Sequence, residues 1–554
     1  MPRGLSFEQI GVTEALIETY AETVWKMSNN IQIRRGDPIR RLEFERVAAE
    51  RADLGMSDAQ IAGVLGLTRD QVMAVRVLTE VRRFRRRSYY ELYAIGRGKR
   101  FNPGRHVPLA ARSGFRPEAL ELRGALKFDA RQVGRYVAEG WWAADTLPGW
   151  FAARAVAMPL RLAVRSTGGD IDYASLLARV ERFAAGLHAL GIGRGDVVAV
   201  QLPNIPEFVI AYIAIARIGA VMSTVDMTCR KAELRRLLAL GRARALICLS
   251  RSKDDQLAGA ALALKASLPA LEHVIVVGRQ VRGALAFDKV AAGGEALPND
   301  LAPAPADPLL LLFTYGASTI PKAVPLTSQA TLGNARLGAP EHRITADDVL
   351  LSAAPFSQIF GLYGLHLAAS VGAASLMLPE FTPQAFAQAI TKGKPTILFA
   401  GTAHLAAMQK AGLLDTSDWS SVRLVVCSGS ACPPELARAI AASLPKGRFS
   451  QLWGTTETQA ALYTRPDDPL EAAALTVGRP SPGTEIRIAS PSGAALPPGA
   501  KGELQLRGSP MFPGYFGNEK ANARAFTADG WFRSGVLASC DAERNVRIAR
   551  IARP

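Results

Sequence analysis

A turn of small and hydroxylated residues separates two apolar stretches near the middle of the chain. Residues 309–313 form an apolar run long enough for a buried strand, and the apolar pattern resumes after Pro321 and Lys322. Small residues let backbone N–H groups approach a polyanion, hydroxyls donate further hydrogen bonds, and a lysine supplies a point charge. We therefore predict a phosphate cradle between two strands. The alternative is an ordinary strand-turn-strand segment with a surface lysine.

This cradle resembles the phosphate loop of the adenylate-forming acyl-CoA synthetase family, which reads Thr-Ser-Gly-Thr-Thr-Gly-x-Pro-Lys-Gly. It is not a Walker A loop, because no Gly-Lys-Ser/Thr follows. The positions that match or nearly match are Thr314, Gly316, Ser318, Pro321 and Lys322. The positions that depart are Tyr315, Ala317, Thr319 and Ala323, and two of these replace glycines. Glycine tolerates positive φ and close ligand approach, so we expect an altered cradle.

Residues 451–458, which read Gln-Leu-Trp-Gly-Thr-Thr-Glu-Thr, resemble the family motif Tyr-Gly-x-Thr-Glu and preserve Gly454. An aromatic side chain can stack on adenine, a threonine hydroxyl can hold the α-phosphate, and a carboxylate can bind Mg²⁺ beside phosphate oxygens. The resemblance implies these three roles for Trp453, Thr456 and Glu457. The predicted catalytic residues are Lys322, Thr456 and Glu457, and Glu457 is the predicted metal ligand.

A second turn of small residues follows a predicted strand at residues 425–427. Gly429, Ser430 and Ala431 carry little bulk, which suits the close approach of a planar ring, and the prolines after them can begin a helix. In the family this backbone lines the adenine and acyl pockets. The resemblance therefore implies that these residues bind the nucleotide, whereas the alternative is a plain strand-turn-helix connection.

Several other family positions are altered. Gln358 stands where the family has a histidine beside the carboxylate pocket, and glutamine forms hydrogen bonds but does not titrate. Val536 replaces the aspartate that holds the ribose hydroxyls, which removes a charge-assisted contact worth about 1.5–3 kcal/mol.

Arg550 matches the arginine of the family's hinge and is expected near the ribose. His366 and His404 lie in apolar sequence, and we interpret both as interior histidines.

The elements that must position these residues alternate between strands and helices. From residue 133 onward this alternation predicts an α/β layered domain with mostly parallel strands. Glycine turns in residues 477–516 predict β-hairpins, which match the family's closing β subdomain. The longest apolar stretch, residues 208–225, contains Arg217 and reads as a buried helix and strand rather than a membrane span. We predict a ligase-like large domain over residues 133–554.

Residues 1–105 differ from the rest. They hold 19 Lys and Arg against 13 Asp and Glu, a net charge of +6, and their apolar residues follow helical spacing. Residues 56–72 resemble a helix-turn-helix, and an arginine run at residues 82–87 can meet phosphates. We predict a small all-α domain that contacts DNA through residues 57–87. The alternative is a helical hairpin with a solvated basic face.

A Gly-, Arg- and Pro-rich connection separates the two parts, and we assign residues 106–132 as a linker. The chain as a whole has 554 residues, 21% charged and 49% hydrophobic, which indicates several globular domains rather than disorder. Its formal charge of +17 and isoelectric point of about 9.9 favour anionic partners. Five cysteines without a paired framework and no apolar leader favour a cytoplasmic location.

The family resemblance implies an AMP-forming acid–CoA ligase. Such an enzyme joins a carboxylate to the α-phosphate of ATP with Mg²⁺, releases pyrophosphate and transfers the acyl group to coenzyme A. Trp141 and Trp142 match the opening segment of aryl- and alicyclic-acid ligases, which favours an aryl, alicyclic or short acyl acid. The family's C-terminal lid domain, with its bridging lysine, is expected to be missing after Arg550. A separate polypeptide could supply that lid.

Two alternatives remain open. The chain could be a DNA-binding regulator whose non-catalytic ligase-like domain senses an acyl-adenylate or acyl-CoA, or it could be a truncated or decaying gene product. The valine at position 536 and the missing lid favour the regulator. The preserved residues 453–457 favour retained nucleotide binding.

Overall fold

The computed structural model describes residues 130–251, 256–294, 297, 301, 303–315 and 321–551. The predicted helix-turn-helix, its arginine run and the predicted linker up to residue 129 lie outside the described residues. Gly316 and Ser318 of the predicted cradle and the side chain of Arg550 also lie outside them. The strands on either side of the cradle and the backbone of Arg550 are described.

The first α/β unit is a largely parallel sheet between two layers of helices. Its strands are β3 (Val197–Gln201), β4 (Val221–Thr224), β5 (Ala245–Leu249), β6 (His273–Val277), β7 (Leu285–Ala286), β8 (Pro308–Tyr315) and β9 (Pro321–Thr327). Its helices are α10 (Tyr173–Ala189), α11 (Pro206–Arg217), α12 (Lys231–Leu240), α13 (Leu257–Lys265) and α14 (Phe287–Ala292). The strand order is β7-β6-β5-β3-β4-β8-β9, and only β9 runs antiparallel to its neighbour. Alternate residues of β3 pack against α10 and α11 on one face and against α12 and α13 on the other.

The second α/β unit repeats this arrangement. Its strands are β1 (Leu162–Arg165), β2 (Ile171–Asp172), β10 (Val349–Ser352), β11 (Ala374–Leu376), β12 (Ile397–Gly401), β13 (Leu424–Ser428), β14 (Arg448–Trp453), β15 (Leu462–Tyr463) and β16 (Arg479–Pro480). Its helices are α15 (Ser328–Glu341), α16 (Ile359–Val371), α17 (Pro383–Gly393), α18 (Thr402–Lys410), α19 (Leu413–Thr416), α20 (Pro434–Ala442) and α21 (Leu470–Leu475). The strand order is β16-β15-β14-β13-β12-β10-β11-β1-β2. The strands from β14 to β1 are parallel, so their carboxyl ends share one edge.

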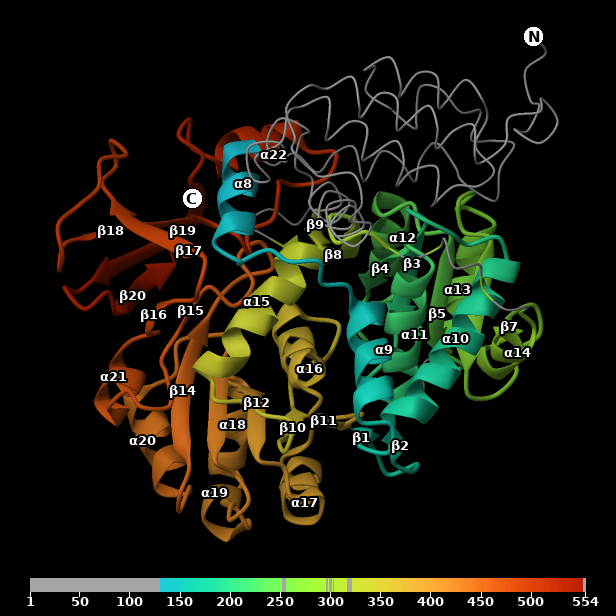
Figure 1. The fold of residues 1–554 in the computed structure, drawn as a ribbon, viewed down its shortest axis with the longest axis horizontal. Helices are drawn as coiled ribbons and strands as arrows, with labels where there is room; N and C mark the ends of the chain where they lie inside the picture. Colours follow the sequence, from blue (N-terminus) through green and yellow to red (C-terminus); the bar gives the residue numbers. More distant parts are fainter. Residues whose placement is uncertain are drawn as a thin grey trace, which may run out of the picture.

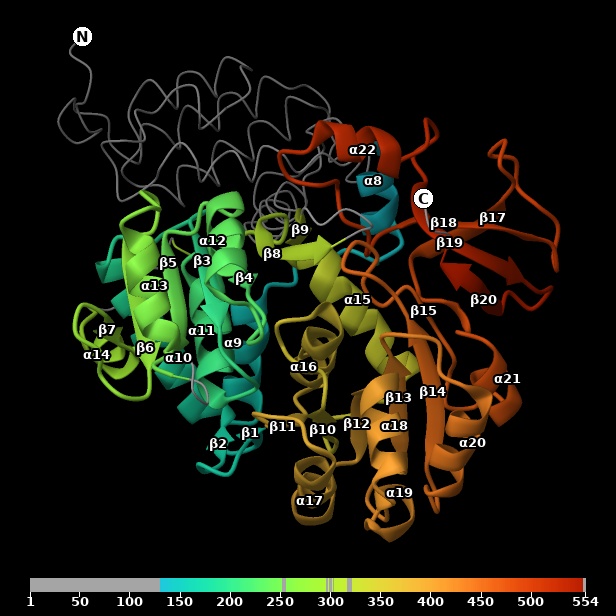
Figure 2. The same ribbon diagram turned by 180° about the vertical axis from the view of Figure 1, so that it is seen from behind.

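An antiparallel β subdomain and three further helices complete the described fold. The elements are β17 (Thr484–Ala489), β18 (Lys501–Gly508), β19 (Phe532–Cys540), β20 (Val546–Ile551), α22 (Glu519–Ala525), α8 (Ala130–Ala138) and α9 (Leu147–Ala157). Figures 1 and 2 show this subdomain beside the edge of the second unit that carries β14, β15 and β16. The structure thus confirms the predicted parallel α/β layers and the closing β hairpins.

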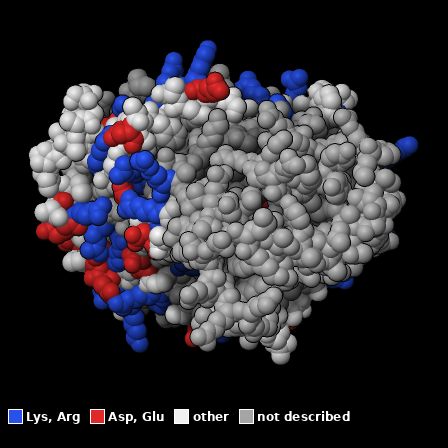
Figure 3. Space-filling view, turned by 45° about the horizontal axis from the view of Figure 1, so that its top comes forward, with Lys and Arg blue, Asp and Glu red and all other residues white. Residues whose placement is uncertain are grey.

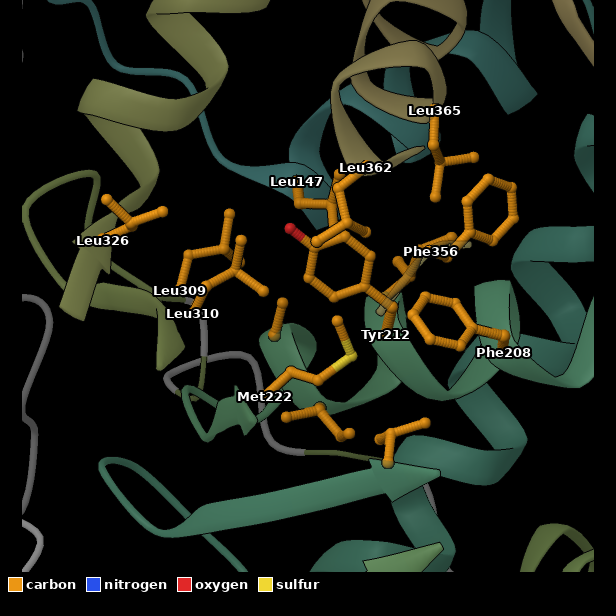
Figure 4. Close-up of a cluster of buried hydrophobic side chains, with 14 of the residues drawn as sticks. Leu147, Phe208, Tyr212, Met222, Leu309, Leu310, Leu326, Phe356, Leu362 and Leu365 are labelled. Atoms are coloured by element: carbon orange, nitrogen blue, oxygen red, sulfur yellow. The ribbon is translucent and has the colours of Figure 1, made fainter. Parts of the chain in front are cut away.

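One large apolar cluster joins the two α/β units. Figure 4 shows side chains from α9, α11, β4, β8, β9 and α16 meeting in it. The labelled members are Leu147, Phe208, Tyr212, Met222, Leu309, Leu310, Leu326, Phe356, Leu362 and Leu365. The apolar run of residues 208–225 provides α11 and β4 at this place, as predicted from the sequence. The units are therefore held together by burial of apolar surface.

The two histidines predicted to be interior are both structural. His366 is buried, its Nε2 lies 2.8 Å from the Tyr212 hydroxyl, and burial lowers its pKa to about 3. His404 is partly buried and accepts a hydrogen bond from the Gly401 amide at 3.1 Å, which closes the first turn of α18. Burial also lowers the pKa of His404. Both imidazoles are therefore neutral near pH 7.

A membrane-spanning helix must be both long and strongly apolar. None of the helices within the described ranges combines the length and hydrophobicity that crossing a bilayer requires.

Basic and acidic side chains are interspersed on the described surface that Figure 3 shows. The pairs Arg487–Asp529 and Arg507–Glu485 of the β subdomain, each at 2.7 Å, illustrate this mixing.

Candidate functional site

Lys322 lies on the strand that leaves the predicted phosphate cradle. The apolar run before the cradle forms β8, the run after it forms β9, and the two strands pair antiparallel with Thr314 opposite Lys322. Side chains of directly opposed residues emerge on the same face of a sheet. The structure thus brings these two predicted phosphate ligands together near the end of β8 and the start of β9.

Glu457 lies in a tight turn at the carboxyl end of β14. The Thr455 amide donates to the Thr458 hydroxyl at 2.8 Å, and the Gln459 amide donates to the Thr455 carbonyl at 2.8 Å. The Phe512 amide donates to the Glu457 carbonyl at 3.0 Å, which holds the turn against the β subdomain. Glu457 is only 5% exposed, whereas Thr456 is half-buried. The turn therefore buries a carboxylate beside an accessible hydroxyl.

Gly454 is required by the shape of this turn. A Cβ atom on Gly454 would lie 1.7 Å from the Gln459 carbonyl oxygen and 2.9 Å from the carbonyl carbon. Trp453, the residue before it, ends β14 and is half-buried. The structure therefore explains the glycine by the shape of the turn, and the predicted nucleotide-binding role of Gly454 stays a prediction.

The Tyr515 hydroxyl connects the lysine and the glutamate. Lys322 Nζ donates to this hydroxyl at 3.0 Å, and the hydroxyl donates to Glu457 Oε1 at 2.8 Å. Two predicted residues from different sheets therefore share one hydrogen-bonding partner. Sequence reasoning did not assign a role to Tyr515. Its signal was the motif Gly514-Tyr515-Phe516, which was used only to recognise the β subdomain.

The small-residue turn at 429–431 lies at the same sheet edge. Its backbone leaves β13, Gly429 adopts a φ of 94°, and the Ser430 carbonyl accepts a hydrogen bond from the Thr402 hydroxyl at 2.9 Å. Gly429, Ser430 and Ala431 are exposed. Because β13 and β14 are adjacent parallel strands, this turn and Trp453 follow neighbouring carboxyl ends, where ligands bind in open α/β sheets.

The segment that carries Gln358 is held by the first α/β unit. Gln358 is the residue before α16, and its side chain does not cap that helix. Asn204 donates to the Ala354 carbonyl at 3.0 Å and accepts from the Phe356 amide at 2.7 Å. The Thr224 hydroxyl donates to the Ser357 carbonyl at 2.6 Å. These contacts fix the backbone immediately before Gln358.

The predicted ribose-side residues lie on the β subdomain. Val536 is on β19, is 7% exposed and pairs with Ile551, and Leu537 next to it pairs with the backbone of Arg550 on β20. Lys322 and Glu457, in contrast, lie on β9 and in the turn after β14. The valine side chain offers no hydrogen-bonding group at its position.

Asn334 on α15 joins the cradle side of the site to the glutamate turn. Its Nδ2 donates to the Ala460 carbonyl at 3.1 Å, and its Oδ1 accepts from the Ala460 amide at 3.2 Å. Asn334 is 4% exposed and Ala460 is 3% exposed, so water does not replace these bonds freely. Helix α15 follows β9 directly, so Asn334 connects the strand of Lys322 to the turn of Glu457.

Replacing Asn334 with alanine should therefore destabilise the protein by about 1–3 kcal/mol, because two buried backbone groups lose their partners. Urea unfolding followed by far-UV circular dichroism measures this change. Thr331→Val is the matched control, since Thr331 is on the same helix and its buried hydroxyl has no partner among the described residues. Equal unfolding midpoints for Asn334→Ala and the control would contradict the inferred role.

The chain is similar to known proteins in both sequence and fold. The family model described as AMP-binding enzyme matches residues 151–516. The salicyl-AMP ligase / salicyl-S-ArCP synthetase of Mycobacterium tuberculosis is 35% identical over 448 residues, which cover 78% of this chain and 77% of that protein. The medium-chain fatty-acid–CoA ligase of Escherichia coli is 28% identical over 432 residues, covering 77% and 76%. The apo structure of Mycobacterium smegmatis MbtA has a TM-score of 0.72 at 32% identity, covering 78% of this chain and 81% of that chain.

Proposed function

This chain belongs to the AMP-binding enzyme family, and we propose that it activates a small carboxylic acid as its acyl-adenylate with ATP and then transfers the acyl group to coenzyme A. The observation that carries the proposal is the meeting of Lys322 and Glu457 at the Tyr515 hydroxyl. A lysine and a carboxylate at one place, beside the exposed turn of residues 429–431 at the end of a parallel strand, suit a magnesium-bound triphosphate.

The predicted residues that the structure describes near Lys322 and at the carboxyl ends of β13 and β14 take the following roles in this proposal. Lys322 supplies positive charge to the phosphates, with Thr314 opposite it on β8. The Thr456 hydroxyl binds the α-phosphate at the point where the acid attacks. Trp453 and the backbone of residues 429–431 contact the adenine ring. These groups position the two reactants and stabilise the charge that develops on the phosphate.

Glu457 fits a magnesium ion. Proteins commonly hold Mg²⁺ through one or two carboxylates together with substrate phosphates, and this carboxylate is buried against a neutral hydroxyl rather than an arginine. A bound magnesium ion would neutralise part of the negative charge of the phosphates. Glu457 would hold the ion and keep it near the phosphates that Lys322 binds.

The acid is proposed to be aryl, alicyclic or short acyl. The relative named salicyl-AMP ligase is 35% identical to this chain, and the relative named for a medium-chain fatty acid is 28% identical. Gln358, whose preceding backbone is fixed by Asn204 and Thr224, offers a neutral amide to the acid. We expect the altered Gln358 and Val536 to lower affinity for the acid and the nucleotide rather than to change the reaction.

The DNA-binding alternative depends on residues 57–87, which lie outside the described residues. The division into a helical domain at 1–105, a linker at 106–132 and a ligase-like domain from residue 133 stays a prediction. The proteins to which this chain is similar are named as ligases and synthetases. Acid activation is therefore the function that we propose.

Carboxylate-dependent exchange of labelled pyrophosphate into ATP tests the proposal. The full chain is incubated with ATP, Mg²⁺ and, in separate reactions, benzoate, salicylate, cyclohexanecarboxylate and hexanoate. We expect exchange with at least one acid and none when the acid is omitted. Absence of exchange with every acid, from a protein that is folded by circular dichroism, would contradict the proposed function.

A further inference from the structure

The side chain of Tyr515 is held at the place where three parts of the fold meet. Its amide donates to Asn522 Oδ1 at 2.6 Å, and its carbonyl accepts from Asn522 Nδ2 at 2.9 Å. Its ring packs edge-on against Phe512 at 4.9 Å between centroids. Tyr515 is 5% exposed. The hydroxyl is thus fixed by α22 and the loop before it, and it points to a lysine of the first sheet and a glutamate beside the second.

The donor and acceptor capacity of this hydroxyl matches its two partners. A phenol has one proton to donate and lone pairs to accept with, and here it donates to Glu457 and accepts from Lys322. Burial, and then the nearby Glu457 carboxylate, raise the pKa of Tyr515, so the phenol keeps its proton. Lys322 Nζ also lies 4.2 Å from the centroid of the Tyr515 ring, which adds a cation–π contact.

Removing the hydroxyl would leave the buried Glu457 carboxylate and the half-buried Lys322 ammonium without the partner that they share. A buried carboxylate without a partner is costly, so Lys322 and Glu457 would pair directly. Such an ion pair occupies the groups that must receive phosphate and magnesium. The neutral hydroxyl gives each charged group a hydrogen bond without neutralising its charge, so both charges stay available to substrate.

We propose that Tyr515 is a positioning residue that keeps Lys322 and Glu457 from pairing with each other, so that both stay available to magnesium-bound ATP. This inference rests on the proposed function, because it assigns Lys322 to phosphate and Glu457 to the metal. The inference predicts that Tyr515 acts in nucleotide binding rather than in the chemical step. Once magnesium-bound ATP is bound, it replaces the Tyr515 hydroxyl as the partner of Lys322 and Glu457.

Tyr515→Phe tests the inference, because phenylalanine keeps the ring, its contact with Phe512 and the cation–π contact while removing only the hydroxyl. We expect the KM for ATP and the Mg²⁺ concentration for half-maximal exchange each to rise about tenfold, with kcat changed by less than about threefold. Tyr363→Phe is the matched control, since Tyr363 is also a buried tyrosine but its ring packs against His342 and Phe399 rather than near Lys322. The control should match the wild-type protein in both constants.

A merely structural role for the hydroxyl would give a different result. Loss of folded enzyme lowers kcat and leaves KM unchanged, and that outcome would overturn the inference, as would unchanged constants in Tyr515→Phe. If the wild-type protein shows no exchange, the proposed function fails. Calorimetric titration of the protein with ATP in the presence of Mg²⁺ then tests the inference by itself. A tenfold weaker ATP affinity in Tyr515→Phe supports it, and equal affinity or no ATP binding by the wild-type protein overturns it.

Discussion

Replacing Glu457 with glutamine should lower carboxylate-dependent ATP–pyrophosphate exchange by about 100- to 1,000-fold, which is the usual cost of removing one preorganised charge-stabilising group. Glutamine has nearly the same shape, and its Oε1 can still accept the hydrogen bond from Tyr515. The substitution therefore removes the negative charge and leaves the packing of this buried residue in place. Because Mg²⁺ prefers carboxylate oxygen ligands, the loss should appear as a large rise in the Mg²⁺ requirement.

Glu435→Gln is the matched control for this prediction. Glu435 is exposed in the first turn of α20 and makes no contact with Lys322 or Tyr515 among the described residues. We expect its exchange rate to equal that of the wild-type protein. If Glu457→Gln exchanges at nearly the wild-type rate when both proteins are assayed at the same Mg²⁺ concentration, this glutamate is not the metal ligand.

Replacing Gly454 with alanine should be the second most damaging change at the site. The added methyl group would lie 1.7 Å from the Gln459 carbonyl oxygen, and that atom belongs to backbone that cannot rotate away like a side chain. The turn would have to move, and with it Thr456 and Glu457. We expect a loss of about 1–3 kcal/mol in the free energy of unfolding, the usual range for overpacking, and a fall of about 100-fold in exchange, since misplacement by 1 Å has that effect.

Gly193→Ala serves as the comparison, because a Cβ atom on Gly193 would have no heavy atom within 4 Å. Thermal unfolding and exchange should be close to wild type for this variant. If Gly454→Ala keeps both wild-type stability and wild-type exchange, the turn around Glu457 is not the rigid support that the structure indicates.

The sequence allowed the local parts of the site to be predicted. The apolar runs beside the cradle became β8 and β9, and the small-residue turn at 429–431 follows β13 as predicted. These features depend on patterns within about ten residues, which hydrophobic periodicity reports directly. The fold class followed from the alternation of strands and helices and from the family motifs.

The side-chain contacts between segments that are far apart in the sequence could not be predicted in this way. Tyr515 is 193 residues from Lys322 and 58 residues from Glu457, and Asn334 is 126 residues from Ala460. Their contacts depend on how the β subdomain packs against two sheets, which no local pattern encodes. A motif identified the segment of Tyr515, but only the packed structure shows where its hydroxyl points.

The paired tryptophans illustrate a second limit. Trp141 and Trp142 favoured an aryl, alicyclic or short acyl acid because of their resemblance to an opening segment of related ligases. In the structure Trp142 is buried and donates from its Nε1 to the Ser509 carbonyl at 2.9 Å. Trp141 packs over Gly483, where a Cβ atom would approach its ring to 3.1 Å. Both side chains join the segment after α8 to the β subdomain, so their presence reports on packing as much as on the acid.

A crystal structure of the full chain grown with Mg²⁺ and a non-hydrolysable ATP analogue tests the central claim most directly. We predict a triphosphate within hydrogen-bonding distance of Lys322 Nζ, a metal ion on the Glu457 carboxylate and adenine against residues 429–431. A nucleotide bound elsewhere on the molecule, with Lys322 and Glu457 still joined only by the Tyr515 hydroxyl, would contradict the account.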